Sequence, residues 1–198
     1  MINSKQDYRD YLEADRRALG RSHGLHNWVR DLFFPDYIWR FQRLLRRVEY
    51  HKNLGARSIA SRVSYVYWKR PFRRLSMQLG FTIPENVFGP GLAIVHYGTI
   101  VVNEGARVGA NCRIHPGTTI GASAGGNRAP RIGDNVYFAP GVKVFGDIVI
   151  ASNTAIGANA VVTESFAEEN TMLAGVPARR IKTIDIRQII RHLNERPC

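Results

Sequence analysis

The sequence predicts a mostly β protein, in which a solenoid of stacked parallel coils follows an α-helical region. An apolar residue recurs at every sixth position from Val102 to Ile120 and, after one 12-residue step, from Ile132 to Val162. Strands alternate with a period of two and α-helices with a period of about 3.6, so a period of six indicates a short strand followed by a turn. Such a unit cannot bury its apolar side alone, and successive coils must stack to form one core. An antiparallel sandwich of short strands would not keep this phase over so many repeats.

Helices are expected in residues 1–80, before the repeat begins. Ser4 followed by Asp7 has the spacing of a capping box, in which each side chain binds a backbone N–H of the other residue. This pattern predicts a first helix that ends at about Leu19.

Two further helices are expected in the same region. Apolar residues at intervals of three and four after Pro35 predict the second helix, and they are Ile38, Phe41, Leu44, Leu45 and Val48. The third helix is expected from about Ser58 to Leu79, with a kink or break at Pro71.

The formal net charge is +12, and most of it lies in the helical region. Residues 1–80 hold 17 Lys and Arg against 7 Asp and Glu, whereas residues 81–198 hold 11 against 9. A basic surface attracts anions such as phosphorylated cofactors, acidic glycans or anionic lipid, although arginines on a helix are usually a solvated face. No helix-turn-helix, zinc or RNA-sheet signature accompanies the charge, so we expect no nucleic-acid binding.

The two cysteines, Cys112 and Cys198, give no disulfide framework. Cys112 falls in an inward position of the repeat, where a reduced thiol behaves as a small apolar residue, and this favours a reducing cytoplasm. The first residues are polar and no run approaches about 18 apolar residues, so we expect neither a signal peptide nor a transmembrane segment. The histidines have no metal-ligand spacing, and no CxxC or carboxylate cluster appears, so we expect no metal site.

The first coil is irregular near His96. Ile94 and Ile100 are six residues apart, but they are two residues out of phase with Val102 and the residues that follow it. An irregular unit in a regular solenoid often marks a functional site. A neutral imidazole can take a hydroxyl proton near neutral pH, so His96 is a candidate general base, although a histidine beside Tyr97 is more often structural.

The 12-residue step contains the segment from Gly121 to Arg131, which is rich in Gly and Ala. The period is intact on its far side, so this segment must loop outward from the coil. Glycines allow a ligand to approach the backbone closely, and Arg128 or Arg131 can meet a phosphate. No GK[ST] follows, so the segment is not a Walker loop.

Residues 81–182 resemble the hexapeptide-repeat acyltransferases, and most closely the serine acetyltransferase-like group. The segments that carry this resemblance are HYGTIVVNEGARVGANCRIHPGTTIG, NRAPRIGDNVYFAPGVKVFGD and TMLAGVPARRI. The resemblance implies a left-handed parallel β-helix after an N-terminal helical domain, and assembly as a homotrimer or a dimer of trimers. It also implies acetyl transfer from acetyl-CoA to the hydroxyl of a small molecule or glycan.

The resemblance implies roles for single residues as well. HYGTIVV corresponds to the family's HATGIVV motif and puts His96 at the catalytic base, with direct transfer and no acyl-enzyme. A backbone N–H near Ala122 would hold the oxyanion, and the coenzyme A arm would run in a groove between adjacent subunits. The residues implied for coenzyme A are Gly121, Ala122, Ser123, Arg128, Pro140, Gly141, Ala158 and Arg179. Simple coil packing or a solvated charge is the alternative explanation for each of them.

Two departures from the family weaken free serine as the acceptor. Phe81 stands where the family has an Asp that supports the base, and Ala129 replaces a His that helps to hold the amino acid. The loss of both polar groups favours a sugar hydroxyl of a surface polysaccharide or its precursor, with serine as the alternative acceptor. Asp15 or Glu13 from the helical region is expected to supply a replacement carboxylate, although Glu13 fits surface charge better.

His115 is a second catalytic candidate. It follows the inward Ile114, so strand alternation points it outward, as an acceptor contact or auxiliary base. A non-catalytic scaffold that docks its basic region on a partner enzyme or an acidic glycan is the competing class of function. Residues 183–198 have the apolar spacing of a short amphipathic helix, which would cap the last coil or pack on a neighbouring subunit.

Overall fold

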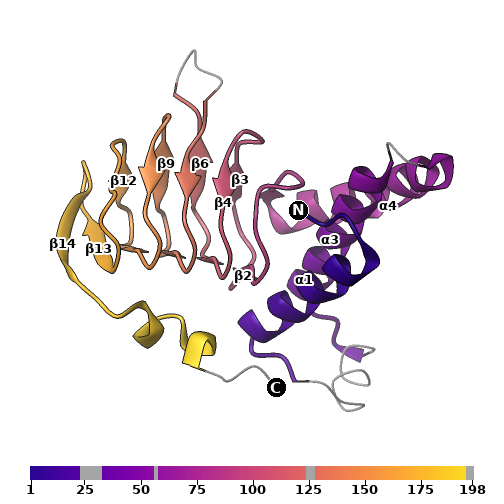
Figure 1. Cartoon of the computed structure of the whole chain (residues 1–198), viewed down its shortest axis with the longest axis horizontal. Coiled ribbons are helices and arrows are strands. Elements are labelled where there is room, and N and C mark those ends of the chain that lie inside the picture. Colours follow the sequence, from indigo (N-terminus) through magenta and orange to yellow (C-terminus); the bar gives the residue numbers. More distant parts are fainter. Residues whose placement is uncertain (23–32, 56–57, 124–127, 195–198) are drawn as a thin grey trace.

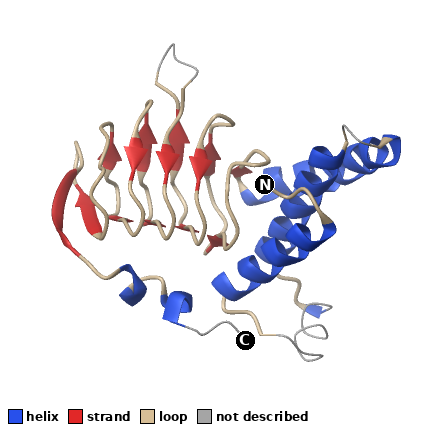
Figure 2. Ribbon diagram, in the orientation of Figure 1, coloured by secondary structure: helices blue, strands red, loops and turns tan. Residues whose placement is uncertain are grey.

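The structure is a computed structural model, and it describes residues 1–22, 33–55, 58–123 and 128–194. Helices pack beside one end of a β-coil, and they are α1 (Lys5–Ala18), α3 (Tyr37–Leu54) and α4 (Ile59–Leu79) (Figure 1). α3 contacts both α1 and α4. Helices and strands therefore occupy separate parts of the molecule, as the colours of Figure 2 show.

Local signals explain where the helices begin and end. The capping box is confirmed, because the Asp7 N–H donates to Ser4 Oγ at 3.0 Å and the Ser4 N–H donates to Asp7 Oδ2 at 3.1 Å. α4 ends at Gly80, whose φ of 77° is in the left-handed region that glycine tolerates. Of the kink or break expected at Pro71, the break is wrong, because α4 continues through this residue, and the kink stays a prediction. Packing of its buried side chains, such as Phe72, holds the helix together there.

Short strands follow α4 and form the coil. They are β1 (Phe81–Thr82), β2 (Ala93–Ile94), β3 (Ile100–Val102), β4 (Arg107–Val108), β5 (Arg113–Ile114), β6 (Thr119–Gly121), β7 (Arg131–Ile132), β8 (Tyr137–Phe138), β9 (Lys143–Phe145), β10 (Val149–Ile150), β11 (Ala155–Ile156), β12 (Val161–Val162), β13 (Thr171–Ala174) and β14 (Arg179–Thr183). Sheet A has the order β1-β3-β6-β9-β12, sheet B has β4-β7-β10, and sheet C has β2-β5-β8-β11-β13-β14. From β2 to β12 the strands enter the three sheets in rotation, so each turn of the coil has three sides.

Parallel pairing carries the six-residue repeat from one coil to the next. Tyr137 pairs with Ala155, and Lys143 pairs with Val161. The two residues of each pair are three six-residue units apart in the sequence. Every residue of the six-residue series between Val102 and Val162 is at most 5% exposed. The expected stacking of coils around an apolar core is therefore confirmed.

The irregularity of the first coil lies in the turn that carries His96. Seven positions separate Ile94 from Val101, whereas only five separate their paired residues, Ile114 and Thr119. The two extra residues of the out-of-phase unit are accommodated between β2 and β3. The stacked coil keeps its pairing on both sides of that turn, so the turn itself bulges.

The expected loop after β6 is also present as an insertion. Eleven positions separate Ile120 from Arg131, compared with five between Val144 and Val149 in the next coil. Sheets A and B keep their parallel pairing across the insertion. The insertion therefore does not interrupt the strand pairing on either side of it.

A β-strand covers the edge of the last coil, in place of the expected α-helix. β14 turns back and pairs antiparallel with β13, where it covers the edge of sheet C. The chain continues in two short 3-10 helices, Ile186–Gln188 and Arg191–Asn194, so the expectation of one amphipathic helix is wrong. Ile186 and Ile190 pack against Ala155 on the side of the coil. Figure 1 shows this segment returning along the coil toward the helices.

Candidate functional site

One corner of the coil collects several residues that the sequence singles out. His96, His115, Pro140 with Gly141, and Ala158 each lie in a turn between a strand of sheet C and the next strand of sheet A. Backbone hydrogen bonds connect these turns in a row, from the Gly117 N–H to the Thr99 carbonyl at 2.7 Å and from the Gly141 N–H to the Pro116 carbonyl at 2.9 Å. Residues far apart in sequence therefore lie along one edge of the molecule.

His115 has a defined ring orientation and tautomer. Its Nδ1 lies 2.8 Å from the carbonyl oxygen of Phe138, and a carbonyl can only accept a hydrogen bond, so Nδ1 carries the proton. The other ring nitrogen, Nε2, is then left with its lone pair. Burial lowers the pKa of His115, and the positive charges of Arg113 and His96 lower it further, against an opposing contribution from the Phe138 carbonyl. A half-buried neutral imidazole of this kind is a suitable proton acceptor.

His96 is exposed, and its ring centroid lies 6.4 Å from that of His115. The His115 ring in turn lies 5.0 Å from that of Tyr137 on β8. The two histidines are thus neighbours at the junction between the helices and the first coils. The structure brings together the two imidazoles that the sequence singled out separately.

A cleft of about 390 Å³ adjoins the residues that precede His96. Ile94 and Val95 form one wall of it, and the other side comes from the end of α1 and the start of α3. Arg21 and Asp36 line this cleft and form an ion pair there. Asp36 also accepts the Trp39 N–H at 3.0 Å, which fixes it at the beginning of α3. The cleft therefore presents one cation and one anion close to the bulged turn.

Arg21 and Asp36 were not predicted from the sequence as residues of the site. They are 15 residues apart, and neither belongs to a recognisable motif. Asp36 follows Pro35 and precedes an apolar helical pattern, so its capping position was the available signal. Its place beside Val95 arises from the packing of the helices on the coil, which the sequence does not display.

The structure corrects the expectation for Asp15. Its side chain is fully buried, and its carboxylate is hydrogen bonded to the Arg46 guanidinium at 2.8 and 3.1 Å. It also accepts the N–H groups of Gly91 and Leu92 at 2.9 and 2.8 Å. A carboxylate enclosed in this way is not available to an acceptor, so Asp15 anchors α1 to the start of β2. Glu13, the other candidate, pairs with Arg16 at 2.6 Å.

Apolar packing surrounds the two positions at which the chain departs from the family pattern. Phe81 is buried, and its ring meets that of Phe41 edge to face at 5.0 Å. Ala129 is also buried. Neither position brings a polar side chain to the histidines.

Four other residues implied for coenzyme A lie at a different corner. Gly121, Ala122 and Ser123 are at the end of β6, where the chain passes from sheet A towards sheet B. Arg128 lies just before β7 and pairs with Asp147 at 2.9 Å across the same corner. In one subunit, sheet A therefore separates these residues from Pro140, Gly141 and Ala158.

Two arginines follow the last complete coil. Arg179 forms an exposed ion pair with Glu164, and Arg180 pairs with Glu168 at 2.9 Å. Exposed pairs of this kind contribute little to stability, so exchanging the carboxylate for a phosphate would cost little.

Cys112 is not placed for nucleophilic catalysis. Its side chain is buried in the coil, and burial raises the pKa of its thiol. Cys198 lies outside the described residues. Across the described ranges, no group of three or more His, Cys, Asp or Glu side chains is arranged to hold a metal ion. A search of the same ranges finds no helix with the length and apolar character needed to cross a membrane.

Serine acetyltransferases are similar to this chain in sequence and in fold. The chain is 40% identical over 106 residues to a serine acetyltransferase of Staphylococcus aureus, which covers 52% of this chain and 49% of that enzyme. The crystal structure of serine acetyltransferase from Brucella abortus matches 91% of this chain and 71% of its own, with a TM-score of 0.69 and 25% identity. Serine acetyltransferase from Neisseria gonorrhoeae in complex with serine matches 90% of this chain and 71% of its own, with a TM-score of 0.66 and 26% identity. No protein-family model matches the chain.

The resemblance to serine acetyltransferases is confirmed by these comparisons, in sequence over the coil and in fold over most of the chain. The chain spans about half the length of the curated relatives it matches.

Proposed function

We propose that the protein is an acetyl-CoA-dependent O-acetyltransferase and that serine is its acceptor. The main support for this proposal is the pair of neighbouring imidazoles, His96 and His115, beside a cleft that is lined by Arg21 and Asp36. Serine carries an ammonium and a carboxylate, which a carboxylate and a guanidinium can bind respectively. The similarity to serine acetyltransferases supports the same acceptor.

In the proposed reaction, His96 acts as the general base. It takes the proton of the acceptor hydroxyl as that oxygen attacks the thioester carbonyl carbon of acetyl-CoA. The tetrahedral oxyanion is held by a backbone N–H at Ala122 of the adjacent subunit, since sheet A separates Ala122 from His96 within one subunit. When the intermediate collapses, the C–S bond breaks, and the leaving thiolate of coenzyme A takes the proton back from the imidazolium. The buried Cys112 supports this direct transfer over an acyl-enzyme route.

His115 is proposed as the auxiliary group of the pair. Its Nδ1–H is committed to the Phe138 carbonyl, so its Nε2 can accept a hydrogen bond from the acceptor or from an intervening water. Phe81 and the buried Asp15 leave His96 without a carboxylate of the kind that orients the base in the family. A second, well-oriented imidazole supplies a fixed polar group at this corner in its place.

A homotrimer of left-handed coils is part of the proposal. The residues implied for coenzyme A lie at two corners of sheet A, and a groove between adjacent subunits could use one corner from each. The fold similarity to the Brucella enzyme supports the handedness. The free thiol of Cys112 supports a reducing, cytoplasmic location.

A sugar hydroxyl of a surface polysaccharide or its precursor is the second candidate acceptor. The observation that favours it is the apolar burial of Phe81 and Ala129, which stand where the family has an Asp and a His. The sequence alone favoured this acceptor over serine. Arg21 and Asp36 weaken the preference for a sugar, because they place a cation and an anion from the helical region in the cleft, where both can bind serine.

An acceptor panel tests the proposal. Purified protein is incubated with acetyl-CoA and with serine, free sugars or nucleotide-sugars, and thiol release is followed together with the mass of the acceptor. Thiol release with serine and an acetylserine product are expected. Acetylation of a sugar with no reaction of serine would show that the acceptor is a sugar. Absence of coenzyme A binding in calorimetry would favour the non-catalytic scaffold.

A further inference from the structure

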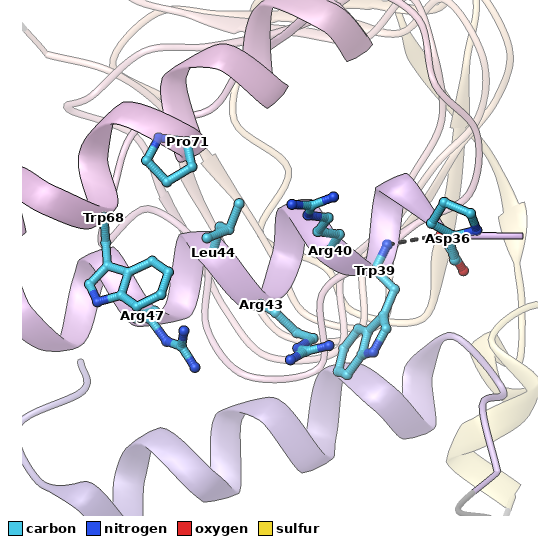
Figure 3. Close-up of a pocket in the computed structure, with 9 residues that line it drawn as sticks. Asp36, Trp39, Arg40, Arg43, Leu44, Arg47, Trp68 and Pro71 are labelled. Carbon is cyan, nitrogen blue, oxygen red and sulfur yellow. Dashed lines mark hydrogen bonds between the residues drawn. The ribbon is translucent and has the colours of Figure 1, made fainter. Parts of the chain in front are cut away.

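A groove of about 280 Å³ lies between α3 and α4, and the turns that carry His96 and His115 do not line it. Figure 3 shows that its arginines, Arg40, Arg43 and Arg47, come from α3. Trp68 and Pro71 come from α4, on the other side. Of the residues that line the groove, Asp36 alone also lines the cleft proposed for serine, and the arginines and tryptophans have no role in the proposed acetyl transfer.

The three arginines carry positive charge that the described part of the chain does not neutralise. Their spacing along α3 puts them on one face of the helix. None of them forms an ion pair or hydrogen bond with a carboxylate among the described residues. Arg46 provides the contrast on the same helix, because Asp15 and Glu49 pair with it at 2.8 and 3.0 Å.

The lining contains one acid, Asp36, and this carboxylate is already engaged. It pairs with Arg21 and accepts the backbone N–H of Trp39. The groove therefore presents three guanidinium groups that have no acidic partner of their own within residues 1–22, 33–55, 58–123 and 128–194. An anion would be attracted to it, and a phosphate matches the fork of N–H donors on each guanidinium.

Aromatic walls give the groove a second chemical property. The guanidinium carbon of Arg47 lies 4.2 Å from the centroid of the Trp68 ring, so the two planar groups are held together. This contact orients the guanidinium and leaves its in-plane N–H groups for a ligand. Trp39 and Trp68 are both half-buried, and both line the groove. Indole rings favour stacking with a nucleobase or with the apolar face of a sugar.

We propose that this groove binds a phosphorylated ligand that carries a ring able to stack on indole. The phosphate lies against Arg40, Arg43 and Arg47, and the ring lies against Trp68 or Trp39. A nucleoside phosphate and a sugar phosphate share this chemistry. The inference does not depend on the acetyl-transfer reaction, because it concerns residues outside the proposed catalytic corner.

Titration calorimetry on the full-length protein tests the proposal with three probes. UDP carries a base and phosphates, glucose 1-phosphate carries a sugar and a phosphate, and inorganic pyrophosphate carries no ring. Coenzyme A is left out of these titrations, because its adenine ring and phosphates would compete for the groove, and variants locate the binding instead. Saturable binding of UDP or glucose 1-phosphate is expected, and the tighter of the two identifies the source of the ring.

Matched variants locate the binding. Arg40→Gln combined with Arg43→Gln is expected to weaken the ring-bearing probe about 100-fold, since each charge-assisted contact contributes about tenfold. Trp68→Leu is expected to weaken the ring-bearing probe about tenfold more than pyrophosphate, because both probes lose the orientation of Arg47 but only the ring-bearing probe loses the stacking surface. The control, Arg73→Gln with Arg74→Gln, removes two exposed charges of α4 outside the groove and should leave binding unchanged.

Each contrary outcome overturns a stated part of the proposal. No saturable binding, or equal weakening by the control pair, would show that the groove is not a site. Pyrophosphate binding as tight as that of both other probes, with all three probes weakened equally by Trp68→Leu, would remove the ring from the proposal. Circular dichroism and thermal unfolding of every variant separate loss of binding from loss of fold.

Discussion

Replacing Arg46 with Met should strongly destabilise the protein and loosen the junction between the helices and the coil. The Arg46 guanidinium is fully buried, and it donates to Asp15, Glu49 and the carbonyl oxygens of Phe88 and Gly89. Met has a similar length but no charge and no donor. The variant would leave two buried carboxylates without their cation.

The magnitude follows from those stranded groups. Removing one partner of a buried ion pair costs about 3–5 kcal/mol, because the remaining charge stays in a poorly solvated site. Globular domains are stable by about 5–15 kcal/mol in total, so Arg46→Met should lose a large part of that stability. Asp15 also holds the N–H groups of Gly91 and Leu92, a few residues before His96, so activity should fall with stability.

Urea unfolding followed by circular dichroism measures this effect. Arg46→Met is compared with Arg43→Met, which removes an exposed arginine from the same helix and should unfold like the wild type. Adding Asp15→Asn to Arg46→Met should recover part of the loss, because it removes one of the stranded charges. A loss below about 1 kcal/mol for Arg46→Met would show that this buried network does not hold the helices and the coil together.

Three further outcomes are expected. If His115 assists the base, the acid limb of kcat/KM should lie below pH 6.5, because burial lowers the pKa of His115 and its ring stays neutral until the pH falls through that pKa. The pH profile of the wild type is compared with that of His115→Asn. An identical acid limb in both proteins would exclude His115 from the reaction. Asp36→Asn should raise KM for serine about tenfold with little change in KM for acetyl-CoA, and an equal rise for both substrates in initial-rate kinetics would argue against an acceptor contact. Burial raises the pKa of Cys112, so in a Cys198→Ala background the folded protein should react with a thiol reagent only as fast as it unfolds, and immediate labelling would contradict its inward position.

The sequence predicted the coil well because its period depends on residue types that occur at fixed intervals. The inward series around Ile114 and Phe138 needs no tertiary information, since each unit repeats the same strand and turn. The phase shift between Ile94 and Val102 also predicted where the coil bulges, because an insertion changes the count of residues between paired strands.

The helical region was less predictable, because its charges have roles that depend on packing. Arg46 belongs to a row of arginines that has the pattern of a solvated face, and it is nevertheless fully buried with Asp15. Asp15 was expected at the acceptor for the same reason, since a carboxylate in a helix does not reveal which surface will cover it. Arg21 and Asp36 meet only after α1 and α3 dock on β2.

The C-terminal segment illustrates a further limit. Ile186, Ile189 and Ile190 have helical spacing, which predicted one amphipathic helix. The chain forms two short 3-10 turns instead, because burial of Ile186 and Ile190 against Ala155 requires contact with the coil and not a long helix. Local periodicity therefore located the apolar contacts but not the backbone conformation.

The rate of thiol release from acetyl-CoA by His96→Ala, with serine as acceptor, tests the proposed catalytic base. We expect kcat to fall about 100-fold or more, the usual contribution of a general base, while coenzyme A binding and thermal stability stay at wild-type values. The exposed position of the ring makes a folding defect unexpected. A variant as active as the wild type would contradict the assignment of His96 as the base.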